Sequence, residues 1–388
     1  MHVNTRYGLI GCGMMGQEHV RNIALIGQAE VAAILEPDEG MRERARRLAP
    51  AARMAFSIEE LLAKDDLDCL IIASPNHFHA AQFSEIAAIR PLPLLLEKPV
   101  CVSLDEAVVV KSLAADYPFP IWVAMEYRYM PPIARLIETM HQATGGIRLL
   151  SMREHRFPFL EKVGNWNRFN RNTGGTLVEK CCHFFDLVRL MTTSEPMRIY
   201  ASGAQDHNHR DEIHEGERPD ILDNAYVTID FVSGQRAMVE LSMFAEGSTY
   251  QEEISIAGPA GKIECFVPGP HRFWPVETLG HPPVAKVLVS PRSPRGTYEI
   301  DVPVDRDLLE AGDHNGATYY QHRHFLKALK GEIPVEVTIE DGLKAVVMGL
   351  AAHHSIETGQ AIDLTKPPYA AFFGFDAPSV TALEVVAG

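Results

Sequence analysis

Residues 7–16 read YGLIGCGMMG, an apolar run that passes through three spaced glycines directly into a helix-like segment, and this stretch decides the fold. In a GxGxxG turn the first glycine takes the tight turn, the second leaves room for a diphosphate, and the third lets the helix pack closely on the strand. Free amides at the start of the helix would then bind the diphosphate. The residues expected at this dinucleotide site are Gly11, Gly13, Met14, Met15 and Gly16.

A second apolar run, residues 31–35, ends in an acidic residue that bears on the choice of cofactor. Glu36 lies about 20 residues after the last glycine, where dinucleotide-binding folds keep an acid for the adenosine ribose hydroxyls. Its charge would repel a 2′-phosphate, and the residues that follow are Pro37 and Asp38 rather than arginine. We therefore expect NAD in preference to NADP, although Arg42 could swing toward a phosphate.

Length and charge limit the possible partners. At 388 residues the chain is long enough for two domains. The 51 acidic against 36 basic residues give a formal charge of −15, which would repel a nucleic acid or an anionic membrane. No window approaches 18 apolar residues, and no basic segment precedes an apolar core at the N-terminus, so we expect a cytoplasmic protein without a signal peptide. Six scattered cysteines without CxxC spacing favour reduced thiols over disulfides or zinc.

The pattern of apolar and polar residues changes near Glu126. Before it, short apolar runs alternate with helical stretches, which predicts a doubly wound parallel sheet. After it, a helical stretch at 132–141 leads into runs of alternating polarity, which suit a sheet with one buried face, and two helices at 319–329 and 339–357 follow. We predict a dinucleotide-binding domain over 1–126 and a second domain, for substrate and oligomerisation, over 127–388. The tail 366–388 would either pack on a neighbouring subunit or stay loose.

Lys98 is the first candidate for chemistry. It follows Glu97 and precedes Pro99 at the carboxyl end of a predicted parallel strand, where open α/β sheets bind their ligands. An ammonium there can hold a substrate hydroxyl and stabilise its oxygen as the proton leaves. Glu97 should point to the opposite face of the strand. A surface lysine at a strand exit is the alternative interpretation.

A second constellation follows the glycine pair at 174–175. Glu179, His183 and Asp186 are spaced to project from one face of a single helix. Histidine can accept a hydroxyl proton at neutral pH, and a carboxylate one turn away can orient the ring and stabilise its protonated form. A buried structural histidine satisfied by a local carboxylate is the alternative. Without a third ligand or an HExxH motif, we expect no metal here or in the ligand-rich segment 206–215, which looks like a solvated insertion.

Together these motifs resemble the Gfo/Idh/MocA oxidoreductases. The resemblance rests on the glycine turn, the segment 74–79 (SPNHFH), the EKP at 97–99, and the run from the paired glycines through His183 to Asp186. It covers nearly the whole chain. It implies a Rossmann domain followed by an α/β domain with a large open, mainly antiparallel sheet. It also implies a nicotinamide cofactor and oxidation or reduction at a carbinol of a sugar, inositol or related polyol.

The same resemblance implies roles for individual residues. Lys98 would be the catalytic lysine, His183 the proton acceptor, and Glu179 the acid that orients the histidine. The remaining expected cofactor contacts are Ser74, Asn76, His79, Glu97 and Lys98. The expected substrate contacts are His155, Trp166, Asn167, Arg168 and Asp186. Members commonly carry aspartate where this chain has Glu179, and smaller residues where it has Cys181 and Cys182, which implies a repositioned substrate.

The function expected from the sequence is therefore an NAD-dependent dehydrogenase of a ring alcohol, working as a homodimer or homotetramer. Two alternatives stay open: an NAD-dependent glycoside hydrolase that oxidises its sugar transiently, and a non-enzymatic sugar or NAD sensor. The segment 313–322 could add one substrate contact, or it could be a helix cap followed by core aromatics.

Overall fold

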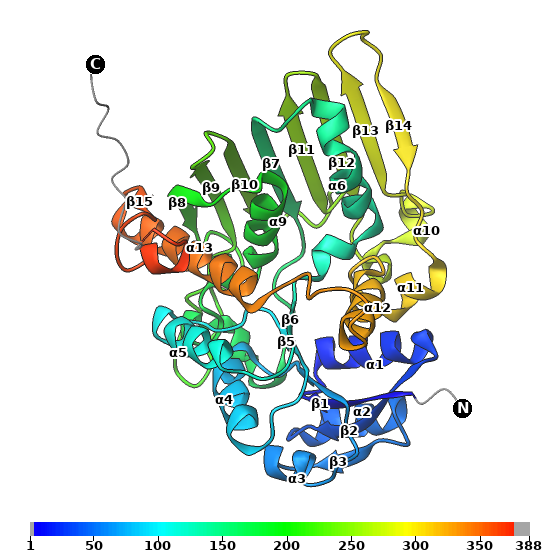
Figure 1. The fold of residues 1–388 in the computed structure, drawn as a ribbon. Coiled ribbons are helices and arrows are strands. Elements are labelled where there is room, and N and C mark those ends of the chain that lie inside the picture. The colour runs from blue at the N-terminus through cyan, green and yellow to red at the C-terminus, as the bar shows by residue number, and fades with distance from the viewer. Residues whose placement is uncertain (1–3, 376–388) are drawn as a thin grey trace, which may run out of the picture.

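The structure, a computed structural model, describes residues 4–375 and contains two sheets. The blue and cyan first sheet lies at one end of Figure 1, and the larger green and yellow sheet lies at the other. The strands of the first sheet, in the order β3-β2-β1-β4-β5-β6, are all parallel. They are β1 (Thr5–Ile10), β2 (Ala29–Leu35), β3 (Arg53–Ala55), β4 (Cys69–Ile72), β5 (Leu94–Glu97) and β6 (Ile121–Ala124).

Five helices alternate with these strands, so the first half is the predicted doubly wound sheet. They are α1 (Met14–Ile26), α2 (Glu39–Leu48), α3 (Ile58–Leu62), α4 (His79–Ile89) and α5 (Leu104–Ala115). The strands β4, β5 and β6 are buried at every position, as expected for strands with both faces covered. The chain order reverses between β1 and β4, and this crevice is where doubly wound folds bind their ligands.

The second sheet has nine strands in the order β14-β13-β12-β11-β7-β10-β9-β8-β15. Among the described strands, β10 with β7 is a parallel pair and the other pairs run antiparallel, so the sheet is mainly antiparallel as expected. The strands are β7 (Leu149–His155), β8 (Pro196–Ala204), β9 (Asn224–Phe231), β10 (Arg236–Ser242), β11 (Glu252–Gly258), β12 (Gly261–Val267), β13 (Lys286–Pro291), β14 (Tyr298–Asp301) and β15 (Ile362–Asp363).

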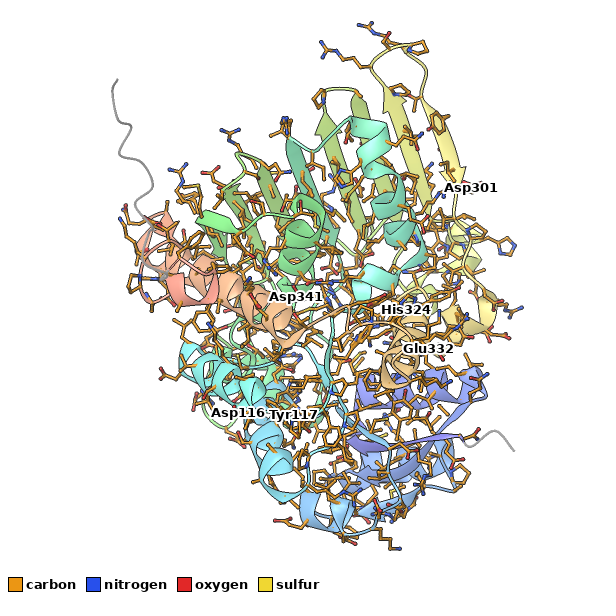
Figure 2. The ribbon with its side chains drawn as sticks, in the orientation of Figure 1. Asp116, Tyr117, Asp301, His324, Glu332 and Asp341 are labelled. Carbon is orange, nitrogen blue, oxygen red and sulfur yellow. The ribbon has the colours of Figure 1, made fainter. Side chains whose placement is uncertain are left out.

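Helices cover one face of this sheet and leave the other open (Figure 1). The covering helices are α6 (Pro131–Thr144), α9 (Cys182–Thr192) and α13 (Ile339–Thr358). Side chains fill the space between them and the strands, and Asp341 marks the first turn of α13 in Figure 2. Alternating burial along β7, β9 and β10 produces the buried face that the sequence pattern predicts.

The two halves of the chain interlock. Helix α12 (Ala317–Leu329) packs on α1, where His322 Nε2 lies 2.9 Å from His19 Nδ1. The amide of Val123 on β6 also donates to the carbonyl of Val337 at 3.0 Å. Residues far beyond 126 therefore help to cover the first sheet, and the division of the chain at 126 stays a prediction.

Some elements differ from the sequence expectation. The strands β3, β13, β14 and β15 were not anticipated, because β3 and β15 are very short and prolines break up the pattern around β13 and β14. The first part of the tail packs on its own chain: Lys111 Nζ donates to the carbonyl of Ala371 at 2.7 Å, and Phe372 and Phe373 are buried. Residues 376–388 of the predicted tail lie outside the described part.

All six cysteines are unpaired and buried. Within residues 4–375, no helix combines the length and the apolar character needed to cross a membrane.

Candidate active site

A single large cavity of about 2330 Å³ runs from the glycine turn after β1 to the first turn of α9. Both predicted halves of the site line it. The cofactor candidates on its wall are Gly11, Gly13, Met14, Met15, Glu36, Ser74, Asn76, His79, Glu97 and Lys98. At the other end the wall includes Glu179, His183, Trp166, Lys162, Lys180 and His314.

The glycine turn fits a diphosphate for reasons visible in its geometry. Gly11 has a φ of +86°, and a Cβ there would lie 2.6 Å from the backbone of Ser74. A Cβ on Gly16 would lie 2.3 Å from the carbonyl oxygen of Gly11, so the third glycine permits the close helix packing. A Cβ on Gly13 would meet no protein atom within 4 Å, and α1 has no side-chain cap. The amides of the first turn of α1 are therefore free for an anion.

Glu36 is buried at the end of β2 and is already held by two backbone amides. Its Oε2 accepts from Cys12 N at 2.6 Å, and its Oε1 accepts from Asp38 N at 2.9 Å. A carboxylate has further lone pairs for ribose hydroxyls. Arg42, the candidate for a 2′-phosphate, instead donates its Nη1 to the carbonyls of Glu36 and Pro37 at 2.8 and 3.0 Å. The residues present fit NAD.

The cavity has two ends: the cofactor end at the glycine turn, and the reaction end at Lys98 and His183. The loop after β4 links the two. His79 bridges two carbonyls, with Nδ1 2.8 Å from Pro99 O and Nε2 2.9 Å from Ser74 O. Its ring nitrogens are thus directed at the backbone and hold this loop against the turn after Lys98. Asn76 Nδ2 donates to the carboxylate of Glu179, which connects the loop to the second half of the chain.

Lys98 reaches from the end of β5 into the cavity. Its Nζ donates to the carbonyl of Glu179 at 3.2 Å. Burial alone would lower the pKa of Lys98, but the carboxylates of Glu179, Glu126 and Glu97 outweigh it and raise this pKa above its ordinary value. The side chain therefore stays cationic and can hold an alkoxide-like oxygen.

The single helix expected around His183 is broken. Helix α8 (Thr176–Glu179) ends before Lys180, and α9 begins at Cys182. The carbonyl of Glu179 accepts a hydrogen bond from the ammonium of Lys98. In an unbroken helix this carbonyl would instead accept from the backbone amide of His183. The expectation that Glu179, His183 and Asp186 share one helical face is therefore wrong. Burial raises the pKa of Glu179, but Lys98 and Lys162 lower it below its ordinary range, so this residue is ionised.

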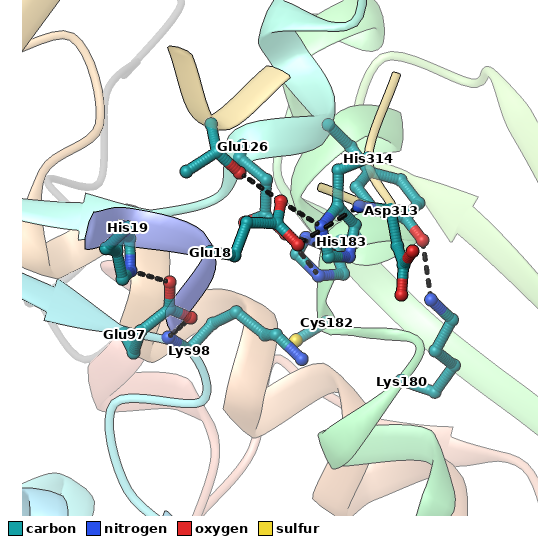
Figure 3. Close-up of polar contacts among 12 residues, drawn as sticks. Glu18, His19, Glu97, Lys98, Glu126, Lys180, Cys182, His183, Asp313 and His314 are labelled. Carbon is teal, nitrogen blue, oxygen red and sulfur yellow. Dashed lines mark hydrogen bonds and ion pairs between the residues drawn. The ribbon is translucent and has the colours of Figure 1, made fainter. Parts of the chain in front are cut away.

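His183 is buried beside a different carboxyl. Its ring stacks on Tyr127 with centroids 4.1 Å apart and an interplanar angle of 5°. Its Nε2 lies 3.6 Å from Oε1 of Glu126, and Figure 3 draws this contact together with the neighbouring ion pairs. Burial lowers the pKa of His183 well below its usual value, and Lys98 and Lys180 lower it further. The ring is therefore neutral at neutral pH and can accept a proton.

A buried network of charged side chains surrounds Tyr127, the residue that stacks on His183. Lys180 Nζ lies 3.0 Å from Glu154 Oε1 and 2.5 Å from the hydroxyl of Tyr127. Arg156 Nη1 pairs with the same Glu154 oxygen at 3.1 Å. Burial lowers the pKa of Lys180, as does Arg156, whereas burial and Glu154 raise that of Glu252 to about 7. These charges hold Tyr127 in place under His183.

Four of the predicted substrate contacts are not part of the cavity wall. Asp186 forms a bidentate pair with Arg128. His155 lies on β7, where its Nε2 is 2.9 Å from Glu240 Oε1. Asn167 donates to the carbonyl of Leu160, and Arg168 pairs with Glu212 at 2.8 Å. Each of these polar groups is satisfied within the protein, and their role as substrate contacts stays a prediction.

Trp166 does line the cavity, and Asn167 and Arg168 brace the loop that carries it. The same loop brings Lys162 Nζ to 4.8 Å from the Trp166 ring. Three further wall or near-wall residues were not singled out from the sequence: Glu126, Tyr127 and Lys180. His314 came from the segment for which one substrate contact was considered. Glu126 could have been found from its place two residues after the end of β6, the neighbour of β5 in the sheet.

The insertion at 206–215 is tied to the same loop. Glu212 accepts from Arg168 and contacts His209 and His214, each at 2.7 Å. Within residues 4–375, no group of three His, Cys, Asp or Glu has an arrangement that could hold a metal ion.

The combination of a Rossmann sheet, a glycine turn, and an ammonium and an imidazole on one cavity defines an NAD-binding oxidoreductase. Residues 5–125 match the family profile described as the oxidoreductase family, NAD-binding Rossmann fold. Residues 145–364 match the profile of the oxidoreductase family, C-terminal alpha/beta domain. The chain belongs to the Gfo/Idh/MocA oxidoreductase family.

Individual relatives are more distant. The chain is similar to a myo-inositol 2-dehydrogenase of Thermotoga maritima, with 22% identity over 93% of this chain and 99% of that protein. It is 30% identical to the rhizopine catabolism protein MocA of Rhizobium meliloti, over 49% of this chain and 58% of that protein. A solved oxidoreductase from Agrobacterium radiobacter, in complex with NAD+, L-tartaric acid and magnesium, shares the fold with a TM-score of 0.76 at 18% identity, over 93% of this chain and 99% of that one.

Proposed function

We propose that the protein is an NAD-dependent dehydrogenase that transfers hydride between a ring carbinol of a sugar, an inositol or a glycoside and the nicotinamide. The observation that carries this proposal is that Lys98 and His183, from the two halves of the chain, line the same cavity as the glycine turn. The relatives named inositol dehydrogenases support the substrate class. Bound NAD would supply the hydride acceptor at the reaction end.

The chain's own residues would manage the alcohol proton. Lys98, cationic and fixed by the Glu179 carbonyl, would donate a hydrogen bond to the substrate oxygen and stabilise the charge that develops there. His183, neutral because it is buried, would accept the hydroxyl proton. Glu179, held by Asn76, would keep the Lys98 ammonium charged and in position.

The test is a screen of purified protein with NAD against inositols, aldoses, glycosides and sugar acids, with NADH formation followed by absorbance. We expect NADH with at least one ring polyol in the wild type and loss of the signal in Lys98→Ala. Consumption of a glycoside without accumulation of NADH would replace the dehydrogenase by a glycoside hydrolase that recycles its cofactor. NAD binding without turnover of any polyol or glycoside would support a sensor instead.

We also propose that the protein is a homodimer or homotetramer. The open face of the second sheet exposes the apolar side chains of Leu149, Tyr226 and Met238 on adjacent strands. Burying such a face between two copies would remove apolar surface from water. Light scattering coupled to size exclusion measures the mass directly, and a monomer at micromolar concentration would contradict this proposal.

A further inference from the structure

Lys162 lies on the loop after β7, where this loop reaches the reaction end of the cavity. It directly precedes the turn Val163–Arg168, and its side chain is half-buried on the cavity wall. Its Nζ lies 4.8 Å from the centroid of the Trp166 ring, which is on the same wall. Glu179 and Lys98 both act on the pKa of Lys162, so its ammonium is near the groups proposed for the chemistry.

The loop fixes the base of this side chain. The carbonyl of Lys162 accepts from the amide of Asn165 at 2.8 Å, which closes a turn where Gly164 has a φ of +65°. The carbonyl of Leu160, earlier in the loop, accepts from Asn167 Nδ2 at 3.0 Å. The backbone that carries the ammonium is therefore organised by the protein itself, and a ligand that binds there does not have to order it.

Four other cations at the reaction end each have an oxygen partner. The pairs are Lys98 with the Glu179 carbonyl, Lys180 and Arg156 with the Glu154 carboxylate, and His314 with Glu18. Lys162 instead faces the uncharged ring of Trp166. Burial lowers the pKa of Lys162 below its ordinary value, although Glu179 opposes this shift. The ammonium has thus lost hydration without full compensation, and a negatively charged group on a ligand would supply it.

The neighbouring acids are engaged elsewhere. The carboxylate of Glu179 accepts from Asn76, and Oε1 of Glu97 lies 2.9 Å from Nε2 of His19. A neutral polyol would offer Lys162 only hydroxyl groups. A carboxylate on the substrate ring would form an ion pair in a cavity partly shielded from water, where such pairs are stronger than in bulk solvent.

A carboxylate fits this place better than a phosphate. One ammonium balances the single charge of a carboxylate, whereas a phosphate monoester carries about −1.5 to −2 charges at neutral pH. A phosphate would therefore call for a second free cation. Arg156, on the same loop, already pairs its Nη1 with Glu154 Oε1 at 3.1 Å.

We propose that Lys162 selects a sugar acid: its ammonium pairs with the carboxylate of a uronate-like ring substrate while Lys98 holds the hydroxyl that is oxidised. This inference rests on the proposed dehydrogenase function and narrows its substrate class to ring polyols that bear a carboxylate. Trp166, which the sequence predicts as a substrate contact, would lie beside the same ring. Lys162 is a specificity-determining residue and takes no part in proton or hydride transfer.

The first experiment measures binding and needs no turnover. Protein saturated with NADH is titrated in a calorimeter with D-glucuronate, D-galacturonate and their parent aldoses. We expect at least one acid to bind about tenfold more tightly than its aldose, as for one charge-assisted hydrogen bond. This ratio should fall to within about twofold in Lys162→Met and persist in Lys162→Arg, because the second variant keeps the charge. No preference for an acid in the wild type, or an undiminished preference in Lys162→Met, overturns the proposal.

Two controls accompany the titration. Arg306→Met removes a positive charge from an exposed part of the same wall, where this side chain is 87% exposed, and should leave the ratio unchanged. Unchanged affinity of Lys162→Met for NADH shows that this variant is folded. Weaker binding of NADH with an unchanged ratio would assign Lys162 to the cofactor and overturn the proposal.

The second experiment follows NADH formation with the same pairs and with D-glucose 6-phosphate. We expect Lys162→Met to raise KM for the acid about tenfold and to lower kcat by less than about threefold, as for loss of uniform binding. Better turnover of the phosphate than of either acid would overturn the choice of a carboxylate. Turnover of neutral polyols alone would keep the proposed function and overturn this inference. Binding of an acid that depends on Lys162, without turnover of any polyol, would keep this inference while the proposed function fails.

Discussion

The two ends of the cleft are built from different parts of the polypeptide. The cofactor end is mostly backbone: the free amides at the start of α1, two glycines that admit no Cβ, and a glycine that leaves open space. The reaction end consists of ionisable side chains: His183, Glu126 and Lys180 are buried, and Lys98 is half-buried. The first end selects its ligand by shape, and the second acts through charges whose pKa values depend on one another.

This difference predicts different sensitivities. An added methyl group should damage the cofactor end, because backbone cannot move aside cheaply. A change of charge without a change of size should damage the reaction end, because each buried charge depends on its partner. Substitutions at the two ends can therefore separate binding from chemistry.

Lys98→Ala should give the largest effect on turnover. Removing the ammonium that holds the substrate oxygen should lower kcat by about 100- to 1000-fold, as for loss of one oxyanion donor. The affinity for NAD should change by no more than about twofold, because the diphosphate site lies at the other end. Steady-state kinetics and calorimetry with NAD measure the two quantities.

Lys162→Ala is a matched control for Lys98→Ala. It removes a second ammonium from the same cavity, one that lies 4.8 Å from the Trp166 ring. We expect a smaller loss of kcat, because this ammonium does not contact the Glu179 carbonyl. Equal losses in the two variants would mean that the cavity needs positive charge in general rather than Lys98 in particular.

Asp186→Asn tests whether the buried ion pair behind the reaction end also depends on its charges for stability. Arg128 and Asp186 have side chains that are 9% and 1% exposed, so the substitution leaves a buried guanidinium poorly paired. The free energy of unfolding should fall by about 3 kcal/mol, with NAD affinity unchanged in the folded protein. Urea unfolding measures this loss. Asp230→Asn, in the exposed pair with Arg198, should cost less than about 1 kcal/mol.

The outcome also tests the predicted role of Asp186 as a substrate contact. Normal stability of Asp186→Asn together with a raised KM for the polyol would support a place for this residue in the substrate site.

Gly13→Ala and Gly16→Ala probe the cofactor end as a pair. A Cβ on Gly16 would lie 2.3 Å from the Gly11 oxygen, so this variant should lose about 1–3 kcal/mol of stability as well as NAD affinity. A Cβ on Gly13 touches no protein atom, and the glycine pattern predicts the diphosphate beside this second glycine. Gly13→Ala should therefore keep its stability and bind NAD at least about tenfold more weakly, by about 1.4 kcal/mol. Unchanged affinity in Gly13→Ala would contradict the diphosphate placement.

The two ends also differ in how far sequence reasoning reaches. The glycine spacing and the apolar runs are patterns within short segments. The Rossmann half and the residues of its glycine turn could therefore be predicted from the sequence. The pairing of His183 with Glu126 joins segments 57 positions apart, and the pairing of Asp186 with Arg128 joins segments 58 apart. Helical spacing suggested Glu179 as the partner of His183. That inference failed because Lys98 takes the Glu179 carbonyl and the helix breaks there.

Likewise, the sequence does not show whether a polar residue beside a motif faces the cavity or the interior of the protein. Asn167 and Arg168 hold the loop while their neighbour Trp166 faces the cavity, and only the contacts with Leu160 and Glu212 reveal this.

The preference for NAD over NADP is the smallest effect that we expect. It depends on the charge of Glu36, a charged residue at the cofactor end. Glu36 is buried and held by two amides, so its charge cannot swing away from a 2′-phosphate, and Arg42 is bound to backbone carbonyls. We expect NAD to bind about tenfold more tightly than NADP, a difference of about 1.4 kcal/mol. Glu36→Gln should narrow this ratio while keeping one amide contact, and calorimetry with both cofactors measures it. Tighter binding of NADP by the wild type would mean that Arg42 leaves the carbonyls of Glu36 and Pro37 to bind the 2′-phosphate, and that its charge outweighs that of Glu36.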